Sequence, residues 1–258
     1  MSATLTILGC RAGAPANGAA ASGYLIQSNH ATILVDCGPG VALTLASLDP
    51  PPILDAVIVS HRHADHCGDL LALAYQRCFP EPHSALPLFG PPDLAAILDG
   101  LDRLFGIPSL PALTRPLRHS FAFYPVTPGD TFVAAGVLVE TCAACHPVPT
   151  LAMRFPELGL AYTADTALTE TLIEHMDRAA VLLAEATYPT DAGRDLERHG
   201  HMTAAQAGEL AQRAAAGRLL LTHLAAPADA DETYQAAARR YAGAITVVTP
   251  GLRAPLEV

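Results

Sequence analysis

Four side chains that bind metal ions in many proteins lie within six residues of one another. They are His61, His63, Asp65 and His66, and they directly follow the apolar run Ala56–Ser60. Packing alone rarely places this many ionisable groups at the end of a buried strand, because each loses hydration there. A turn at this point would direct His61 and His63 to one side, and Asp65 and His66 to a different side. Neutral imidazoles and a carboxylate suit zinc, and also manganese or iron, so the segment predicts a metal site.

Strand and helix patterns alternate along the whole chain and would position this segment. We expect strands at Thr4–Gly9, Tyr24–Gln27, Thr32–Asp36, Ala56–Ser60, Leu86–Gly90, Val137–Thr141, Leu151–Phe155, Leu160–Thr163, Val181–Ala184, Leu219–Thr222 and Ile245–Thr249. We expect helices at Val41–Leu48, Asp69–Phe79, Leu94–Phe105, Glu170–Met176, Ala204–Ala216 and Ala230–Tyr241. This mixture predicts an α/β (α+β) fold in which two sheets pack face to face and helices cover both outer faces, giving four αββα layers.

No repeat, linker or low-complexity segment divides the chain, so we expect a single domain over residues 1–258. The best-delimited helix follows Thr203, which forms a capping-box pattern with Gln206. We expect Gly217 to supply the left-handed cap at the end of this helix. Surface loops are expected at the Pro-rich segments Pro50–Pro52, Pro80–Pro92 and Pro108–Pro116.

Composition and charge limit the classes of function. Of the 258 residues, 51% are hydrophobic and 16% are charged, which favours a folded globular protein over a disordered one. The formal net charge is −10, and the 15 basic residues are dispersed arginines with no run longer than Arg239-Arg240. Proteins that grip nucleic-acid backbones usually present a concentrated basic face. A long polynucleotide partner is therefore disfavoured, whereas a small phosphate ester is not.

The sequence shows no sign of a membrane or export segment. No apolar run is long enough to span a bilayer, and the first ten residues lack a basic segment followed by an apolar one. The six cysteines have no framework spacing, as expected of thiols kept reduced. We therefore expect a cytoplasmic protein without a membrane partner. No interface is legible, so the sequence leaves a homodimer open.

The segment from His61 to His66 resembles the metal-binding signature of the metallo-β-lactamase superfamily, and the resemblance extends over nearly the whole chain. In that family a third histidine follows a strand, a bridging aspartate ends a strand, and a last histidine ends another strand. His146, Asp165 and His223 match these three positions.

The resemblance implies two divalent metal ions, with zinc expected and manganese or iron able to use the same ligands. One ion would be held by His61, His63 and His146. The second would be held by Asp65, His66 and His223. Asp165 and a hydroxide would bridge the two ions. Asp36, at the end of the run from Ile33, matches an aspartate that supports ligand histidines from outside.

A second pair of residues narrows the reaction. Glu185 ends an apolar run, and His201 lies in the segment Gly200–Thr203, just before the capped helix. Both match the phosphodiesterase branch of the family, which includes ribonuclease Z, where a glutamate after such a strand pairs with a histidine. The resemblance implies that His201, with Thr203, contacts the phosphate and that His201 protonates the leaving oxygen. Glu185 would orient the His201 ring, so this pair and Asp65 form the expected catalytic set.

The short segment between His146 and Asp165 argues against a whole tRNA as substrate. Ribonuclease Z carries a long tRNA-binding arm there, whereas this chain has room for a hairpin only. Matching segments such as Thr6–Cys10 and Ala21–Ile26 most resemble compact bacterial metallo-β-lactamase phosphodiesterases that degrade cyclic nucleotides. The resulting prediction is hydrolysis of a small cyclic or diester phosphate, with a 3′,5′-cyclic nucleotide as the first guess.

Three other functions stay open. One is a lactone, thioester or carboxyl-ester hydrolase of the same fold, in which His201 is a bystander. Another is a tRNA 3′-processing ribonuclease without the arm, and the third is a metal-binding or sensor protein that catalyses nothing. The run Cys142–His146 also matches a haem-attachment pattern. Covalent haem attachment requires export, however, and would give the His61–His66 segment no role.

Overall fold

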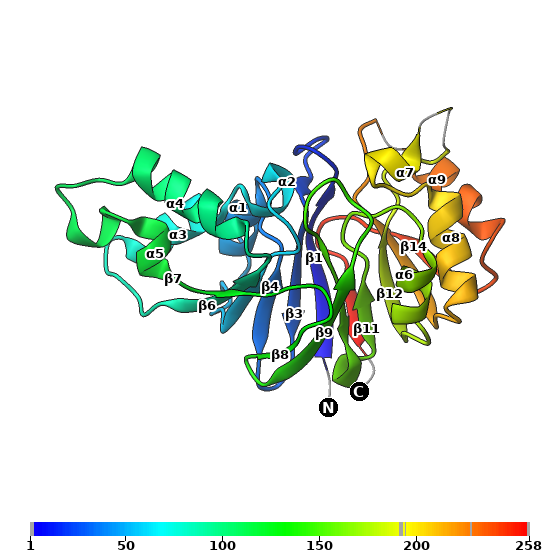
Figure 1. Cartoon of the computed structure of the whole chain (residues 1–258), viewed down its shortest axis with the longest axis horizontal. Helices are drawn as coiled ribbons and strands as arrows, with labels where there is room; N and C mark the ends of the chain where they lie inside the picture. Colours follow the sequence, from blue (N-terminus) through cyan, green and yellow to red (C-terminus); the bar gives the residue numbers. More distant parts are fainter. Residues whose placement is uncertain (1–2, 191–192, 194, 228, 257–258) are drawn as a thin grey trace.

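Two β-sheets packed face to face form the centre of the molecule, and helices cover both outer faces in the computed structural model (Figure 1). The structure describes residues 3–190, 193, 195–227 and 229–256. Within these residues no helix is both long and apolar enough to cross a membrane. The layers confirm the predicted α/β sandwich of αββα type.

Sheet one is made of β1 (Ala3–Arg11), β2 (Ala20–Ala21), β3 (Gly23–Gln27), β4 (Thr32–Val35), β5 (Ala56–Ile58), β6 (Leu86–Gly90), β7 (Phe121–Pro125) and β15 (Arg253–Leu256). Sheet two is made of β8 (Thr131–Ala134), β9 (Val137–Ala143), β10 (Leu151–Phe155), β11 (Leu160–Tyr162), β12 (Val181–Glu185), β13 (Arg218–Thr222) and β14 (Ala244–Val247). The strand order is β15-β1-β3-β4-β5-β6-β7 in sheet one, with β2 beside β1, and β14-β13-β12-β11-β10-β9-β8 in sheet two.

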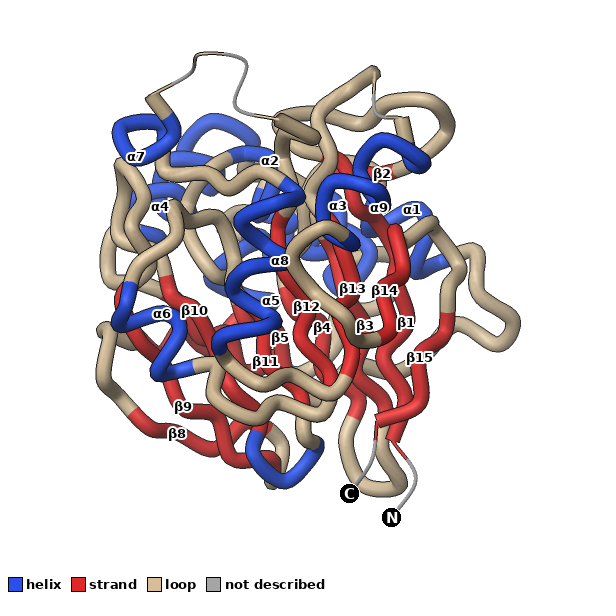
Figure 2. Tube along the Cα trace, turned by 90° about the vertical axis from the view of Figure 1, so that its right-hand side faces the viewer, coloured by secondary structure: helices blue, strands red, loops and turns tan. Residues whose placement is uncertain are grey.

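The helices divide between the two outer faces. Those near sheet one are α1 (Val41–Ala46), α2 (Ala64–Cys67), α3 (Leu70–Cys78), α4 (Leu94–Phe105) and α5 (Pro116–Ser120), with the 3-10 turn η1 (Pro111–Leu113). Those near sheet two are α6 (Glu170–His175), α7 (Leu196–His199), α8 (Ala204–Arg213) and α9 (Ala230–Ala238), with η2 (Pro156–Leu158) in the turn after β10. Figure 2 views the molecule from the right-hand side of Figure 1 and shows α6 and α8 lying over the strands of sheet two.

Apolar side chains fill the space between the sheets. Leu5, Ile7 and Ile33 of sheet one meet Met153 and Leu183 of sheet two in this central layer. There are two further apolar clusters, one between sheet one and its helices and one between sheet two and its helices. Full burial of one such side chain contributes about 1.5–3 kcal/mol relative to exposure, so this packing dominates the energy that holds the layers together.

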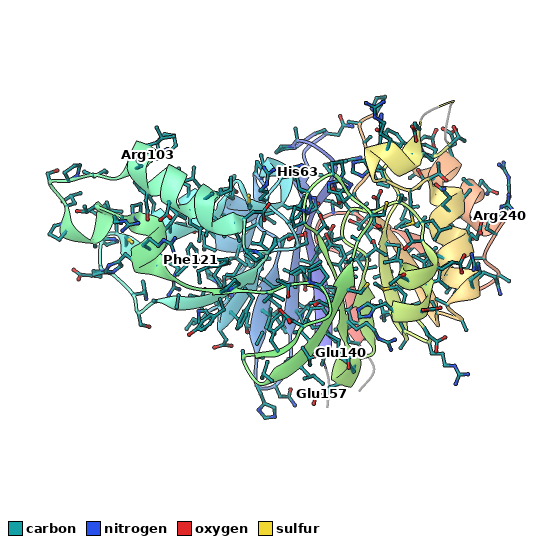
Figure 3. The ribbon with its side chains drawn as sticks, viewed as in Figure 1. His63, Arg103, Phe121, Glu140, Glu157 and Arg240 are labelled. Carbon is teal, nitrogen blue, oxygen red and sulfur yellow. The ribbon has the colours of Figure 1, made fainter. Side chains whose placement is uncertain are left out.

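Parallel pairing brings several strand ends to one edge of the sandwich. β4 and β5 run parallel in sheet one, and β11, β12 and β13 run parallel in sheet two. Within each sheet their carboxyl ends therefore lie at the same edge. His63, which follows β5, lies at this edge in Figure 3, and Glu157, in the turn after β10, lies at the opposite end.

Helix α8 begins as predicted but ends differently. Thr203 Oγ1 accepts a hydrogen bond from the Gln206 backbone, and the Gln206 side chain accepts one from the Thr203 backbone, which completes the capping box. The prediction for Gly217 is wrong, because the left-handed residue after the helix is Ala215, with φ 50°. A Cβ on Gly217 would lie 2.7 Å from the backbone oxygen of Ala180, so this glycine instead allows two backbone segments to approach closely.

The Pro108–Pro116 segment is not wholly a loop, contrary to the prediction from its proline content. It contains η1, and Pro116 begins α5 at a position where the missing N–H of proline costs nothing. The Asp102 carboxylate of α4 accepts hydrogen bonds from the backbone N–H groups of Leu117 and Arg118, at 2.7 and 3.1 Å. This contact between two helices stabilises the start of α5, and no local sequence pattern indicates it.

Candidate metal centre

Three imidazoles contributed by both sheets form a first ligand group. His61 and His63 follow β5 of sheet one, and His146 follows β9 of sheet two. His63 Nδ1 lies 3.1 Å from His61 Nε2 and 3.0 Å from His146 Nε2. The three ring nitrogens therefore converge closely enough to hold one metal ion.

Two carboxylates and two imidazoles form a second ligand group beside the first. Asp65 and His66 lie in α2, Asp165 follows β11, and His223 follows β13. His223 Nε2 lies 3.2 Å from Asp65 Oδ2 and 3.3 Å from His66 Nε2. Asp165 lies 3.3 Å from His66 Nε2 through Oδ1 and 3.3 Å from His223 Nε2 through Oδ2. Because its Oδ2 is also 3.7 Å from His61 Nε2, Asp165 stands between the two groups.

Hydrogen bonds on their outer nitrogens fix how the histidine rings face the centre. His146 Nδ1 lies 2.8 Å from the carbonyl oxygen of Gly200, which can only accept, so Nδ1 donates the bond. In a neutral ring this leaves the lone pair on Nε2, the nitrogen that faces the first group. His223 Nδ1 lies 2.9 Å from Thr187 Oγ1 in the same way. Such outer partners set the tautomer in which a histidine can bind a metal.

Asp36 supports both ligand groups from beneath. The side chain is fully buried, and Oδ2 lies 2.8 Å from His66 Nδ1. The same oxygen accepts hydrogen bonds from Ser60 Oγ at 2.9 Å and from the Tyr162 hydroxyl at 2.8 Å. Ser60 Oγ in turn lies 3.0 Å from His61 Nδ1. One carboxylate thus positions His66 directly and His61 through Ser60.

The backbone adopts a left-handed conformation at three strand ends around the centre. Asp36, Ala164 and His223 have φ values of 60°, 50° and 55°. Residues with a side chain are disfavoured there, at a cost on the order of 1–3 kcal/mol each, and persist only where the surroundings impose the conformation. The turn at Ala164 immediately precedes Asp165, so the strain is concentrated where the ligands leave their strands.

Burial and charge set the protonation of the ligand side chains. Burial holds the pKa of His61 well below its ordinary value, and the neighbouring His66 ring lowers it further. Burial also lowers the pKa of His63 and of His146, so the first group consists of neutral rings. Burial acts the same way on His66, but the Asp165 and Asp36 carboxylates reverse it and raise the pKa of His66 well above its ordinary value. The carboxylates in and beside the second group therefore favour the binding of a positive charge there, either a proton or a metal cation.

The donor atoms of both groups fit divalent metal ions. Asp165 Oδ1 is buried and makes no well-formed hydrogen bond among the described residues, its one close contact being the His66 ring at 3.3 Å, so a cation would compensate its charge. In the first group, the lone pair of His146 Nε2 faces His63 Nδ1 at 3.0 Å, and neutral rings in this arrangement can donate to a cation. A tetrahedral ion with bonds of ~2.1 Å separates its ligands by about 3.4 Å. The separations between neighbouring donor atoms here range from 3.0 to 3.8 Å, and the nitrogen and oxygen donors suit zinc, manganese or iron.

Glu185 and His201 form a hydrogen-bonded pair next to the ligands. Glu185 ends β12 and is buried, and its Oε1 lies 3.0 Å from His201 Nδ1. The His201 ring centroid lies 5.2 Å from that of His146 and 5.5 Å from that of His223. Burial would lower the pKa of His201, but the hydrogen bond and charge of Glu185 outweigh it and raise the pKa. The structure therefore brings together the two residues that the sequence paired.

Thr203 lies close to this pair in the chain but uses its side chain elsewhere. The side chain is buried, and its hydroxyl caps α8 through Gln206. The structure thus commits this hydroxyl to the helix and brings it to neither ligand group.

Besides Ser60, sequence reasoning missed three further residues at or next to the centre. Thr187 Oγ1 donates to Glu185 Oε2 across 2.6 Å, and the Tyr162 hydroxyl binds Asp36 as described above. The backbone N–H of Gly13 donates to Asp65 Oδ2 across 2.7 Å. Of these three, Thr187 could most readily have been predicted, because it lies two positions beyond Glu185 at the same strand end. Nothing local marks Gly13 or Tyr162.

Comparison with known proteins places this fold and centre in a family. A family profile described as "Beta-lactamase superfamily domain" matches residues 31–224. The probable metallo-hydrolase YhfI of Bacillus subtilis is 32% identical over 226 residues, which cover 85% of this chain and 86% of YhfI. The ribonuclease Z of Shouchella clausii is 26% identical over an alignment 282 residues long that covers 85% of this chain and 86% of that enzyme.

Solved structures agree with the sequence relatives. The crystal structure of YhfI superposes with a TM-score of 0.85 at 29% identity and covers 99% of this chain and 100% of YhfI. The short form of human tRNase Z has the same fold, with a TM-score of 0.76 at 18% identity and coverage of 99% and 100%. With a family match that spans both ligand groups, the chain belongs to the metallo-β-lactamase superfamily and is a metallo-hydrolase of that fold.

Proposed function

We propose that this metallo-hydrolase cleaves a phosphodiester bond in a small molecule, with a 3′,5′-cyclic nucleotide as the first substrate to test. The observation that carries the proposal is the Glu185–His201 pair beside both ligand groups. A histidine held by its own buried carboxylate can supply an acid in addition to an activated water. A phosphodiesterase uses such an acid because its leaving alkoxide must be protonated, and the similarity to ribonuclease Z favours phosphodiester over carboxyl-ester chemistry.

The orientation of His201 suits an acid. Its Nδ1 is occupied by Glu185, so a proton on Nε2 is the one available to a bound substrate. The His201 side chain is 19% exposed and the Glu185 side chain only 1%, so substrate can reach the imidazole but not its carboxylate partner. The hydrogen bond and charge of Glu185 raise the pKa of His201, which favours the protonated ring.

Two divalent cations, which we propose to be zinc, would lower the pKa of water toward ~7 and neutralise negative charge that develops on phosphoryl oxygens. The protein's own residues divide the remaining work. His61, His63 and His146 would hold one position, and Asp65, His66, Asp165 and His223 would hold the other. As the oxygen of water bonds to phosphorus and the ester P–O bond breaks, His201 donates its Nε2 proton to the departing oxygen, while Glu185 keeps the ring aligned and stabilises the charged form.

Charge and chain length favour a small substrate. The net charge of −10 opposes a long polyanion, and the segment between His146 and Asp165 holds only the β10–β11 hairpin. The similarity to ribonuclease Z supports phosphodiester chemistry and makes a tRNA-processing activity the second candidate. A labelled precursor tRNA separates the two: cleavage of the tRNA, with cyclic nucleotides left intact, would replace the first candidate by the second.

The substrate class can be tested directly on the zinc-loaded protein. Bis-p-nitrophenyl phosphate and 3′,5′-cyclic AMP should be hydrolysed, and a lactone and a thioester tested at equal concentration should turn over much more slowly. Faster hydrolysis of the lactone or thioester would reject the phosphodiesterase proposal. His201→Ala should keep both zinc ions and lose turnover of 3′,5′-cyclic AMP by about 10²–10⁴-fold, the usual contribution of a positioned acid. His199→Ala, an exposed histidine at the end of α7, is the matched control and should remain active.

A further inference from the structure

Two buried tyrosines cross the space between the sheets in opposite directions, beneath the ligand groups. Tyr24, on β3 of sheet one, places its hydroxyl 2.9 Å from Thr222 Oγ1, at the end of β13 in sheet two. Tyr162, at the end of β11 in sheet two, donates its hydroxyl to Asp36 Oδ2 of sheet one across 2.8 Å. The two rings meet edge to face, with centroids 5.1 Å apart. Each sheet therefore sends one phenol to a polar group of the other.

Each of these hydrogen bonds ends next to a member of the second ligand group. Thr222 immediately precedes His223, and the Asp36 oxygen that accepts from Tyr162 also contacts His66 Nδ1 at 2.8 Å. That group takes Asp65 and His66 from sheet one, and it takes Asp165 and His223 from sheet two. Its geometry therefore depends on how far apart the two sheets stand at this edge.

Apolar packing sets the general distance between the sheets, and directional contacts add to it at this edge. Burial of apolar surface is itself non-directional, so it does not determine which polar groups of the two sheets meet. A hydrogen bond weakens steeply away from its preferred distance and angle. Two such bonds that run in opposite directions resist both separation and sliding of the sheets where the ligands meet.

We propose that Tyr24 and Tyr162 are positioning residues whose hydroxyls set the spacing between the two halves of the second ligand group and thereby its metal affinity. The inference rests on the two-ion centre but not on the phosphodiester substrate. Metal binding can be measured without any substrate, so this inference and the proposed function can fail independently of each other.

The first test compares three phenylalanine variants loaded with Zn²⁺ alone. Tyr24→Phe and Tyr162→Phe each lose one hydroxyl of the pair. Tyr241→Phe is the matched control, because its buried hydroxyl donates to the backbone oxygen of Ala216, outside the ligand groups. Competition with a chromogenic chelator gives the affinity of each site, elemental analysis after gel filtration gives the zinc content, and thermal unfolding reports general stability.

The wild-type protein and Tyr241→Phe should retain two zinc ions. Tyr24→Phe and Tyr162→Phe should bind the second zinc about tenfold or more weakly while the first stays tight, in line with the effect of losing an outer partner of a ligand. If either variant only lowers the melting temperature and keeps both affinities, as a merely structural hydroxyl would, its assignment is overturned.

A second pair of variants covers the case in which a tyrosine variant does not fold. Thr222→Val removes the hydroxyl that Tyr24 contacts and keeps the side-chain shape, whereas Thr222→Ser keeps a hydroxyl. The valine variant should lose affinity for the second zinc, and the serine variant should keep most of it. Equal zinc affinity in the two would reject the role given to Tyr24.

Discussion

The hydroxyl oxygen of Thr187 lies 2.9 Å from Nδ1 of His223. Because the same hydroxyl donates to Glu185 Oε2, the candidate metal ligand His223 and the Glu185–His201 pair share one buried side chain. Thr187→Val removes this link with little change of shape, so we expect affinity for the second zinc to fall about 10–100-fold and turnover to fall with it. Thr187→Ser should stay close to wild type. Zinc competition and kcat on 3′,5′-cyclic AMP measure both effects, and a loss of turnover alone would assign Thr187 to the His201 pair only.

Glu185 and His201 should behave as one unit in kinetics. Glu185→Gln keeps the size of the side chain but removes the charge that orients and protonates the imidazole. We expect kcat to fall about 10-fold or more, and Glu185→Gln combined with His201→Ala to be no slower than His201→Ala alone. A double-mutant cycle on the zinc-loaded protein measures this coupling. Additive losses would show that Glu185 acts independently of His201.

Removal of metal should lower thermal stability, because both ligand groups draw on both sheets. Zinc at 100 times its dissociation constant contributes about 2.7 kcal/mol, which corresponds to roughly 5–10 °C for a chain of this size. Differential scanning fluorimetry with and without EDTA should show this drop, and added zinc should reverse it. Asp165→Ala, which lacks the residue between the groups, should show little response to EDTA. A wild-type protein indifferent to EDTA would contradict the expectation.

Gly38 should be essential to the metal loop for steric reasons. A Cβ at this position would overlap the backbone oxygen of Asp65 and lie 2.9 Å from the Ala21 Cβ. Gly38→Ala should therefore displace the α2 segment, cost about 1–3 kcal/mol of unfolding free energy and reduce zinc content. Gly100→Ala, in α4 with nothing near the added carbon, should instead stabilise by about 0.5–1 kcal/mol. Urea unfolding compares the two, and equal effects would reject the steric argument.

Thiol reactivity should single out Cys145. The other five cysteines are buried, whereas Cys145 is partly exposed. Burial raises the pKa of Cys142 to about 11, so at pH 8 roughly one molecule in a thousand carries its thiolate. Iodoacetamide at pH 8 should add one group quickly, as seen by intact mass, and Cys145→Ser should remove this fast adduct. Labelling of Cys142 should rise about tenfold per pH unit as the thiolate fraction grows. Fast labelling of Cys145→Ser would show that a second thiol is accessible.

Much of the fold follows from local patterns, and the elements that sequence reasoning missed depend on contacts between distant residues. The helix expected at Leu94–Phe105 forms α4 with those bounds. The strand at Arg253–Leu256 was not predicted, because it is short and contains a proline, which only an edge strand tolerates. The short edge strand at Thr131–Ala134 lacks a long apolar run, and α5 depends on Asp102 of another helix.

The candidate metal ligands could be predicted partly from chemistry and partly from the family resemblance. Histidine and aspartate at the end of a buried apolar strand seldom serve packing, so the segment from His61 to His66 could be identified from its residues, whereas Asp165 was assigned through the resemblance. Tyr24, Tyr162 and Thr187 are common residues in strands, and their roles arise only when two sheets meet. No pattern within one strand can indicate a partner on the opposite sheet, such as Thr222 for Tyr24.

Each ligand group takes side chains from segments that follow strands of both sheets, so ions bound there would also cross-link halves of the chain that are distant in sequence. Release of the metal ions would then report that the two sheets have separated at this edge. Heat, denaturant or pressure that parts the sheets at this edge must free both ions, whereas fraying of an outer helix need not. A fluorescent zinc indicator in the unfolding buffer would therefore follow separation of the two sheets in real time, independently of any change in helix content.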